Sequence, residues 1–150
     1  MNPKLIGNLL VIVQFAVLGV LAVQAWGTWN AAADHGVIWL LLGLSGLVGI
    51  WALSANRPGN FNIHPTPHQD GVLIQHGPYR WIRHPMYTSV LLFGAALALV
   101  ISFLSAWLLW GILAGALLSK ALLEERWMAQ KHPSYIAYLA RSRRFIPFLL

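Results

Sequence analysis

Residues 86–119 read MYTSVLLFGAALALVISFLSAWLLWGILAGALLS, and none of these 34 residues carries a charge. At a rise of about 1.5 Å per residue, one helix of this length would measure about 51 Å, against a bilayer hydrocarbon core of about 30 Å. Such a segment has to turn back. Ser102 and Ser105 are the polar pair in its middle. We therefore expect two membrane helices, at about 86–104 and 106–123, joined by a turn between them.

Two more uncharged segments precede this one. Residues 5–26 and 37–55 are each close to the roughly 20 residues that a helix needs to cross the hydrocarbon core. The chain of 150 residues is 58% hydrophobic and 9% charged, which is typical of a membrane protein. A signal peptide ending at residues 23–25 is the alternative for the first segment, but the apolar run is longer than a typical signal core. The sequence thus predicts one all-α domain over 1–150, a polytopic membrane protein with four transmembrane helices.

The basic residues predict the orientation of these helices. If both termini are cytoplasmic, all ten Lys and Arg residues lie on the inner side, whereas the loop around Asp34 lies outside, as the positive-inside rule requires. This places a loop at 56–85 and a tail at 124–150 on the cytoplasmic face, of the inner membrane if the protein is bacterial. The sequence pI of about 10.4 then indicates attraction to anionic lipid headgroups, and no nucleic-acid partner is expected.

Residues 76–87, HGPYRWIRHPMY, place an unusual number of polar and aromatic groups against the third membrane segment. Taken singly, the arginines could be topology determinants and the rings an interfacial belt. The chain has no cysteine, and its loop histidines lack the paired spacing of a zinc site, so no metal is expected. The adjacent Glu124 and Glu125 are two of only four acids, and Lys120 lies one turn earlier, where a weak helical ion pair with Glu124 is the simplest interpretation.

The arrangement of these residues resembles a known signature. Residues 77–87 follow the pattern GPYRxxRHPxY of the isoprenylcysteine carboxyl methyltransferase family, integral membrane enzymes that use S-adenosylmethionine. The resemblance continues with a Glu-Glu pair, a YxxY pattern and an Arg shortly before an aliphatic residue and Pro. It covers about residues 56–147. The second group of matching residues is Glu124, Glu125, Tyr135, Tyr138, Arg144, Ile146 and Pro147.

The resemblance implies an S-adenosylmethionine site formed by the cytoplasmic loop and the helical tail. Arg83 and Arg144 would bind the cofactor's carboxylate, which suits a guanidinium, and Lys120 would face the methyl acceptor. The sequence departs from the pattern in three places. These are Thr88-Ser89, His132-Pro133, and Lys120, where the eukaryotic enzymes have Arg. The implied cofactor-binding residues are Val72, Leu73, Ile74, Tyr79, His84, Pro85, Met86, Tyr87, Glu124 and Glu125.

The function implied by the resemblance is methyl transfer to a small or lipid-like acceptor, most simply a carboxylate, at the cytoplasmic surface of the bilayer. A carboxylate is already a nucleophile, whereas an amine or a thiol must first lose a proton; His84 is a possible base for that step. The alternatives are a phospholipid amine or thiol methyltransferase, an NADPH-dependent membrane reductase, and a small four-helix transporter. The sequence does not determine the oligomeric state.

Overall fold

The computed structural model describes residues 3–32, 35–56, 60 and 72–149. The described chain is helical, and it contains no β-strand. Most of the loop after residue 56, including His64 and His68, lies outside the described residues. The elements in order are α1 (Pro3–Ala32), α2 (Gly36–Ala55), the short 3-10 helix η1 (Gly77–Arg80), α3 (Pro85–Ile101), α4 (Leu104–Lys131) and α5 (Tyr135–Arg141). The predicted all-α class is confirmed.

Three helices, α1, α2 and α4, are long and apolar enough to cross a membrane. The 17-residue α3 is equally apolar but shorter, so the prediction of four spans stays a prediction. The expected turn inside 86–119 is confirmed. Ser102 ends α3 in a left-handed conformation (φ 58°), its N–H bonds to the carbonyl of Ala98 at 3.0 Å, and Phe103 precedes α4.

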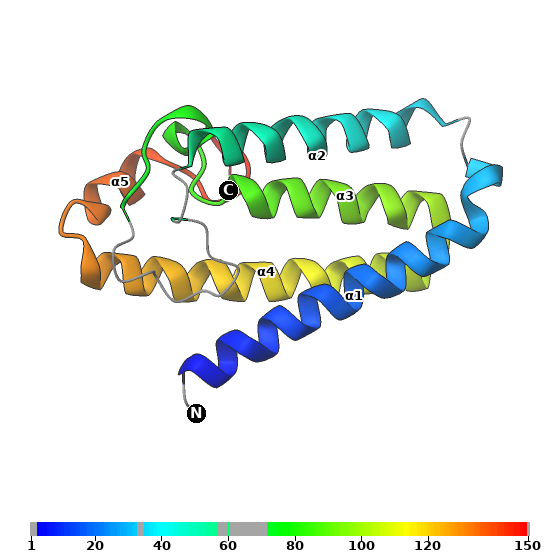
Figure 1. Ribbon diagram of the computed structural model, residues 1–150, viewed down its shortest axis with the longest axis horizontal. Helices are drawn as coiled ribbons and strands as arrows, with labels where there is room; N and C mark the ends of the chain where they lie inside the picture. Colours follow the sequence, from blue (N-terminus) through cyan, green and yellow to red (C-terminus); the bar gives the residue numbers. More distant parts are fainter. Residues whose placement is uncertain (1–2, 33–34, 57–59, 61–71, 150) are drawn as a thin grey trace.

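Helix α3 is the centre of the bundle, because it packs against α1, α2 and α4 (Figure 1). Small residues permit this close packing. At Gly94 an added Cβ would lie 2.9 Å from Leu113 of α4 and 3.2 Å from Trp110. The Trp110 indole also donates a hydrogen bond to the carbonyl of Leu91 at 2.9 Å. On the other side of α3, the Ser45 and Ser89 hydroxyls each donate to the other residue's carbonyl at 2.8 Å, joining α2 to α3.

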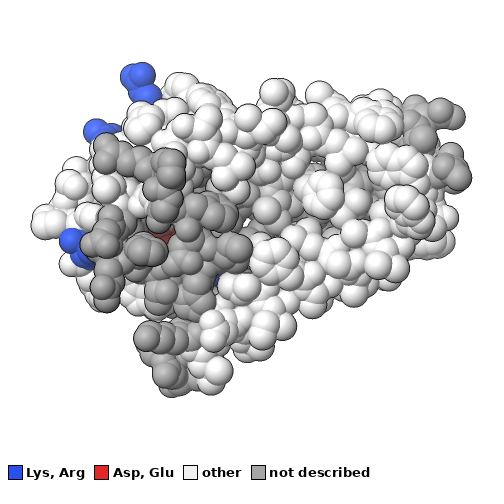
Figure 2. Space-filling view, viewed as in Figure 1, with Lys and Arg blue, Asp and Glu red and all other residues white. Residues whose placement is uncertain are grey.

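The polar parts of the chain gather at one end of the bundle. Helix α1 begins there, and η1, α5 and the segment after α5 all lie there, whereas the turns from α1 to α2 and from α3 to α4 lie at the opposite end (Figure 1). In Figure 2 the visible Lys and Arg side chains are likewise confined to the end that carries α5. This distribution agrees with the one-sided placement of basic residues expected from the sequence.

The segment after α5 is fixed to the start of α3 by backbone hydrogen bonds. The N–H of Arg83 donates to the carbonyl of Arg143 at 2.7 Å, and the N–H of His84 donates to Arg144 at 3.1 Å. The Arg143 N–H returns a bond to Trp81 at 2.8 Å, forming a short parallel bridge. Residues about 60 positions apart therefore become neighbours at the polar end of the bundle.

Candidate active site

His84 lies between the two adjacent glutamates at the polar end of α4. Its Nδ1 is 3.3 Å from Oε2 of Glu124, and its Nε2 is 3.3 Å from Oε1 of Glu125. Neighbouring helix residues point about 100° apart, so the two carboxylates can approach opposite edges of one imidazole ring. His84 immediately precedes α3, and the backbone bond from its N–H to Arg144 fixes its position.

Glu125 is also the partner of both arginines that the resemblance assigns to the cofactor's carboxylate. Nε of Arg83 lies 2.8 Å from its Oε1, and Arg144 donates to both oxygens, at 3.0 and 2.8 Å. Arg83 in addition donates to the carbonyl of Ser142. In this structure the two guanidinium groups therefore tie α4 to the segment after α5, and their contact with a cofactor stays a prediction.

Glu124 occupies a different environment from Glu125. It accepts a hydrogen bond from the hydroxyl of Tyr87, and 22% of its side chain is exposed, against 10% for Glu125. The Tyr87 ring stacks on His84, with centroids 5.2 Å apart and planes 4° from parallel. Glu124 is thus the carboxylate with the greater access to a bound molecule, while Glu125 has the greater number of internal partners.

Lys120 lies on α4 one helical turn before Glu124, and only 1% of its surface is exposed. Its Nζ donates a hydrogen bond to Gln14 of α1 at 2.7 Å and lies 5.0 Å from the centre of the Tyr87 ring. The helical ion pair with Glu124 considered from the sequence is not formed among the described residues. A buried ammonium needs compensation, which here comes from the Gln14 amide and the aromatic face.

Glu124 and Glu125 help to raise the pKa of His84, and Glu124 helps to raise that of Tyr79. Both of these groups lie outside the membrane helices. Burial by itself would lower the pKa of His84, but its hydrogen bonds and proximity to Glu124 and Glu125 outweigh that effect and raise the pKa. Burial, aided by the charge of Glu124, raises the pKa of Tyr79 to about 12. The backbone of Tyr79 is held by Tyr138, whose hydroxyl donates to its carbonyl at 2.6 Å. The raised pKa of His84 favours its charged form, and the phenol of Tyr79 is neutral at neutral pH.

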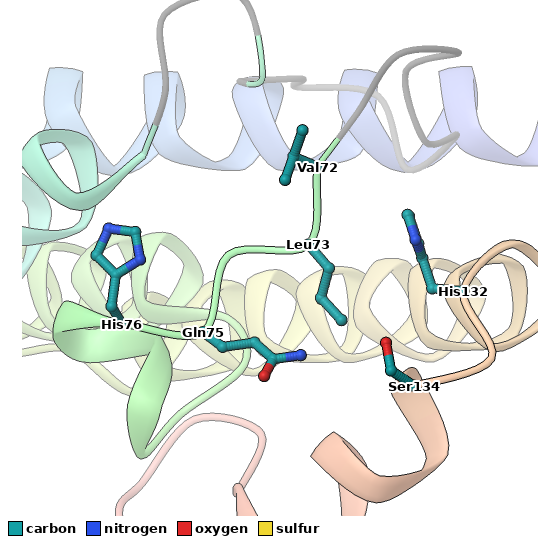
Figure 3. A pocket seen from close by; sticks show the side chains of 6 residues that line it. All are labelled: Val72, Leu73, Gln75, His76, His132 and Ser134. Carbon is teal, nitrogen blue, oxygen red and sulfur yellow. The ribbon is translucent and has the colours of Figure 1, made fainter.

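A cavity of about 660 Å³ adjoins this end of the bundle (Figure 3). Its volume lies within the roughly 300–1,000 Å³ of small-molecule sites. Two of the residues implied for the cofactor, Val72 and Leu73, line it; Ile74 is buried, and Pro85 and Met86 begin α3. Among the described residues, the lining consists of Val72, Leu73, Gln75, His76, His132 and Ser134.

One of the lining residues, His132, has an unsatisfied polar atom. Nε2 of His132 is buried and has no hydrogen-bond partner in the described structure, a condition that costs about 1–3 kcal/mol. Gln75 and Ser134 add neutral polar groups beside the apolar Val72 and Leu73. A lining that combines two apolar side chains with four polar ones can accommodate a ligand such as S-adenosylmethionine, which has a flat heteroaromatic base and hydroxyls. The residues present therefore fit the cofactor that the resemblance implies.

Three contributors to this end of the molecule were not identified from the sequence. Gln14 could have been noticed as an amide in the middle of a membrane segment whose other amides, Asn8 and Gln24, lie near its ends. His132 was noted only as a departure from the family pattern, and Gln75 carried no distinguishing signal. Their roles depend on contacts over long sequence separations, such as the 106 residues between Gln14 and Lys120.

The apolar bundle with its polar groups at one end defines an integral membrane protein with a candidate small-molecule site. Comparison with known families makes the class specific: residues 36–134 match the phospholipid methyltransferase family. The chain belongs to that family, and it is accordingly a membrane methyltransferase, an enzyme class that generally uses S-adenosylmethionine. A search of curated proteins found no significant match.

Proposed function

We propose that this protein transfers a methyl group from S-adenosylmethionine to a small or lipid-like acceptor at the cytoplasmic surface of the membrane. The observation that carries the proposal is the cluster of His84, Glu124 and Glu125 at the polar end of the bundle. A pocket of suitable size lies at the same end, although these three residues are not among its described lining. Family membership supports the reaction class. It favours methyl transfer over the reductase and transporter alternatives.

The cofactor supplies an electrophilic methyl group on a positively charged sulfur. The residues of the protein have to bind it, orient it and keep water away. Glu124 is suited to accept hydrogen bonds from its ammonium or ribose groups, because one face of the Glu124 side chain is partly exposed. Tyr87 and His84 hold that carboxylate from the other side. Glu125 fixes the wall of the site through Arg83 and Arg144.

The acceptor is proposed to enter laterally from the bilayer, toward Lys120. His84 contacts a carboxylate at each ring nitrogen, and its pKa is raised, so it is poorly suited to remove a proton at neutral pH. This favours an acceptor that requires no base, and a carboxylate is the simplest. The family description favours a second candidate, a phospholipid, whose amine would need another route for its proton.

We extend the proposal to the topology. The one-sided distribution of Lys and Arg supports a cytoplasmic position for the polar end and for both termini, with α3 as a fourth span enclosed by the other helices. Cysteine accessibility in inverted and right-side-out vesicles would test this orientation, because the natural chain has no cysteine. A cysteine placed at the exposed Arg126 should react only from the cytoplasmic side.

Calorimetry on the detergent-solubilised protein tests the cofactor directly. We expect binding of S-adenosylhomocysteine, the demethylated product, and no thermal stabilisation by NADPH. His84→Ala and Glu124→Ala should weaken binding while the helical content is retained, and Arg126→Ala, at an exposed position two residues from Glu124, serves as the matched control. Failure of the folded wild-type protein to bind either S-adenosylmethionine or S-adenosylhomocysteine would refute the proposed function.

If the cofactor binds, product analysis with a fatty-acid-like carboxylate and a phospholipid amine would identify the acceptor.

A further inference from the structure

The segment after α5 ends in an exposed apolar turn. Phe145 is buried, but the side chains that follow it are open: Ile146, Phe148 and Leu149 are 48%, 85% and 80% exposed. The N–H of Leu149 donates to the carbonyl of Ile146 at 3.3 Å, so Pro147 and Phe148 are the central residues of the turn. Large apolar side chains gathered in this way indicate a surface that another apolar phase covers.

The backbone at the tip of this turn is unfavourable for a large side chain. Phe148 has a φ of 67°, in the left-handed region that glycine adopts at little cost and bulky residues seldom adopt. Glycine or asparagine is usual where the second central residue of a turn has a positive φ. The turn geometry therefore does not account for a Phe at this position. Its ring has little contact with the rest of the protein, so the partner that would account for it lies outside the chain.

Contacts on both sides fix the depth of the turn relative to the membrane helices. The hydroxyl of Thr88, in the first turn of α3, donates to the carbonyl of Phe145 at 2.8 Å. The N–H of Arg143 donates to the carbonyl of Trp81 at 2.8 Å, and the Trp81 ring lies 5.6 Å from Trp51 near the end of α2. Tryptophan at the end of a membrane helix favours the depth of the lipid headgroups. The turn therefore lies where the hydrocarbon core gives way to the headgroups.

The charges around the turn fit the same boundary. Arg80 and Arg143 are exposed on either side of Trp81. The described acids at this end of the bundle are Glu124 and Glu125, and both are engaged with partners inside the protein. An apolar tip beside exposed guanidinium groups matches the boundary between acyl chains and anionic headgroups.

We propose that residues 146–149 form a membrane anchor, in which Phe148 inserts into the headgroup–acyl boundary of an anionic leaflet. The inference does not depend on the methyl acceptor or on cofactor binding. It has a consequence for the candidate site, because the same segment carries Arg144, which bonds to Glu125 at 2.8 Å, and Phe145, whose ring lies 6.1 Å from His84. The bilayer would thus help to hold this segment against α3 and α4.

A single fluorescent label tests the insertion, because the natural chain has no cysteine. The full chain is reconstituted in nanodiscs of phosphatidylcholine and phosphatidylglycerol, and Phe148→Cys is labelled with an environment-sensitive dye. The matched control is Ile136→Cys, an apolar position of α5 that is 68% exposed. In Figure 1 the red end of the chain lies beside the start of α3, whereas α5 lies farther out along the bundle.

The label at residue 148 should have blue-shifted emission, be quenched by lipids that carry a nitroxide near the headgroup, and lose quenching by aqueous iodide. The label at residue 136 should show the reverse pattern. If iodide quenches the label at residue 148 and the nitroxide lipids do not, the inference is wrong. Failure of the protein to bind S-adenosylhomocysteine would refute the proposed function and leave this result unaffected.

A second variant separates the anchor from the turn itself. Phe148→Gly suits the positive φ better than the natural residue, but it removes the inserted ring. We expect trypsin to cleave next to Arg143 and Arg144 about tenfold faster in nanodiscs, the factor that corresponds to partial burial of one Phe ring. Phe148→Trp, which keeps an aromatic ring, should be cleaved like the wild type. Cleavage of Phe148→Gly at the wild-type rate or more slowly would show that the turn alone holds the segment.

Discussion

Arg144 holds Glu125 through two hydrogen bonds, from Nε to Oε1 at 3.0 Å and from Nη2 to Oε2 at 2.8 Å. The pair connects the last part of the chain to α4, and Arg83 approaches the same carboxylate from the start of α3 at 2.8 Å. Two positive charges thus converge on one acid that is mostly shielded from solvent. This arrangement ties α4 to the start of α3 and to the segment after α5. It and the contacts around it allow several predictions.

The two-bond geometry at Arg144 should not be reproduced by lysine. An ammonium is a single point of charge and cannot match both carboxylate oxygens as the planar guanidinium does. We expect Arg144→Lys to lower the free energy of unfolding by about 1.5–3 kcal/mol, the contribution of a hydrogen bond to a charged group, and to expose the segment after α5 to protease. Limited proteolysis in detergent measures this, with Arg126→Lys as the control. Unchanged cleavage would show that the pair does not hold the tail.

Replacing Glu125 and replacing Glu124 should have different effects on stability and on cofactor binding. Glu125→Ala leaves Arg83 and Arg144 without their shared partner, so we expect destabilisation of about 3–5 kcal/mol, as for other broken buried pairs. Glu124→Ala has fewer internal contacts to lose and should mainly weaken cofactor binding. Thermal unfolding and calorimetry of the two variants separate these effects. Equal destabilisation by both substitutions would contradict the division of roles.

His84 should make the stability of the protein depend on pH. Its pKa is raised in the folded state by the two glutamates, so its contribution is fully present below the ordinary histidine value of about 6.5. That contribution is lost as the pH rises from there through the folded-state pKa. We expect the melting temperature of the wild type to fall over this range relative to His84→Gln, which does not titrate. Parallel pH profiles for the two proteins would exclude the effect.

The Lys120–Gln14 contact joins α1 to α4 inside the apolar bundle. Lys120→Met keeps a long side chain but leaves the Gln14 amide without its partner, and Gln14→Leu does the reverse. The double variant should be more stable than the sum of the single losses predicts, with a coupling of about 0.5–2 kcal/mol, as measured for polar contacts between membrane helices. A double-mutant cycle by unfolding in mixed micelles gives this value. Strict additivity would mean that the contact contributes nothing.

The close approach of α3 and α4 at Gly94 should tolerate no larger side chain. A Cβ there meets Leu113 at 2.9 Å and Trp110 at 3.2 Å, so Gly94→Val should destabilise the protein by about 1–3 kcal/mol through overpacking. Gly43 of α2 has open space around it, and Gly43→Val is the matched control. Thermal unfolding of the two variants in the same detergent makes the comparison. Similar melting temperatures would show that the helices can separate at little cost.

Hydropathy and charge predicted much of the architecture. The long uncharged run at 86–119 required a turn, and the structure has it at Ser102 and Phe103. The tail followed its sequence signals too, because α4 ends at Lys131 just before Pro133, and α5 covers Tyr135 and Tyr138. The helices extend beyond the predicted spans, by six residues at the end of α1 and by eight at the end of α4, since side-chain patterns specify the core of a helix better than its termini.

The sequence by itself determined that the chain is helical and that it is built for a bilayer. These features follow from local composition and from the requirement that backbone groups be satisfied in lipid. The resemblance to a known signature added His84, Glu124, Glu125 and the two arginines as candidate site residues. Only the tertiary structure decided how such residues are paired: His84 between two carboxylates, both arginines on Glu125, and Lys120 on Gln14. Such pairings depend on how the helices pack and on where the tail docks, because they join groups that are distant in the sequence.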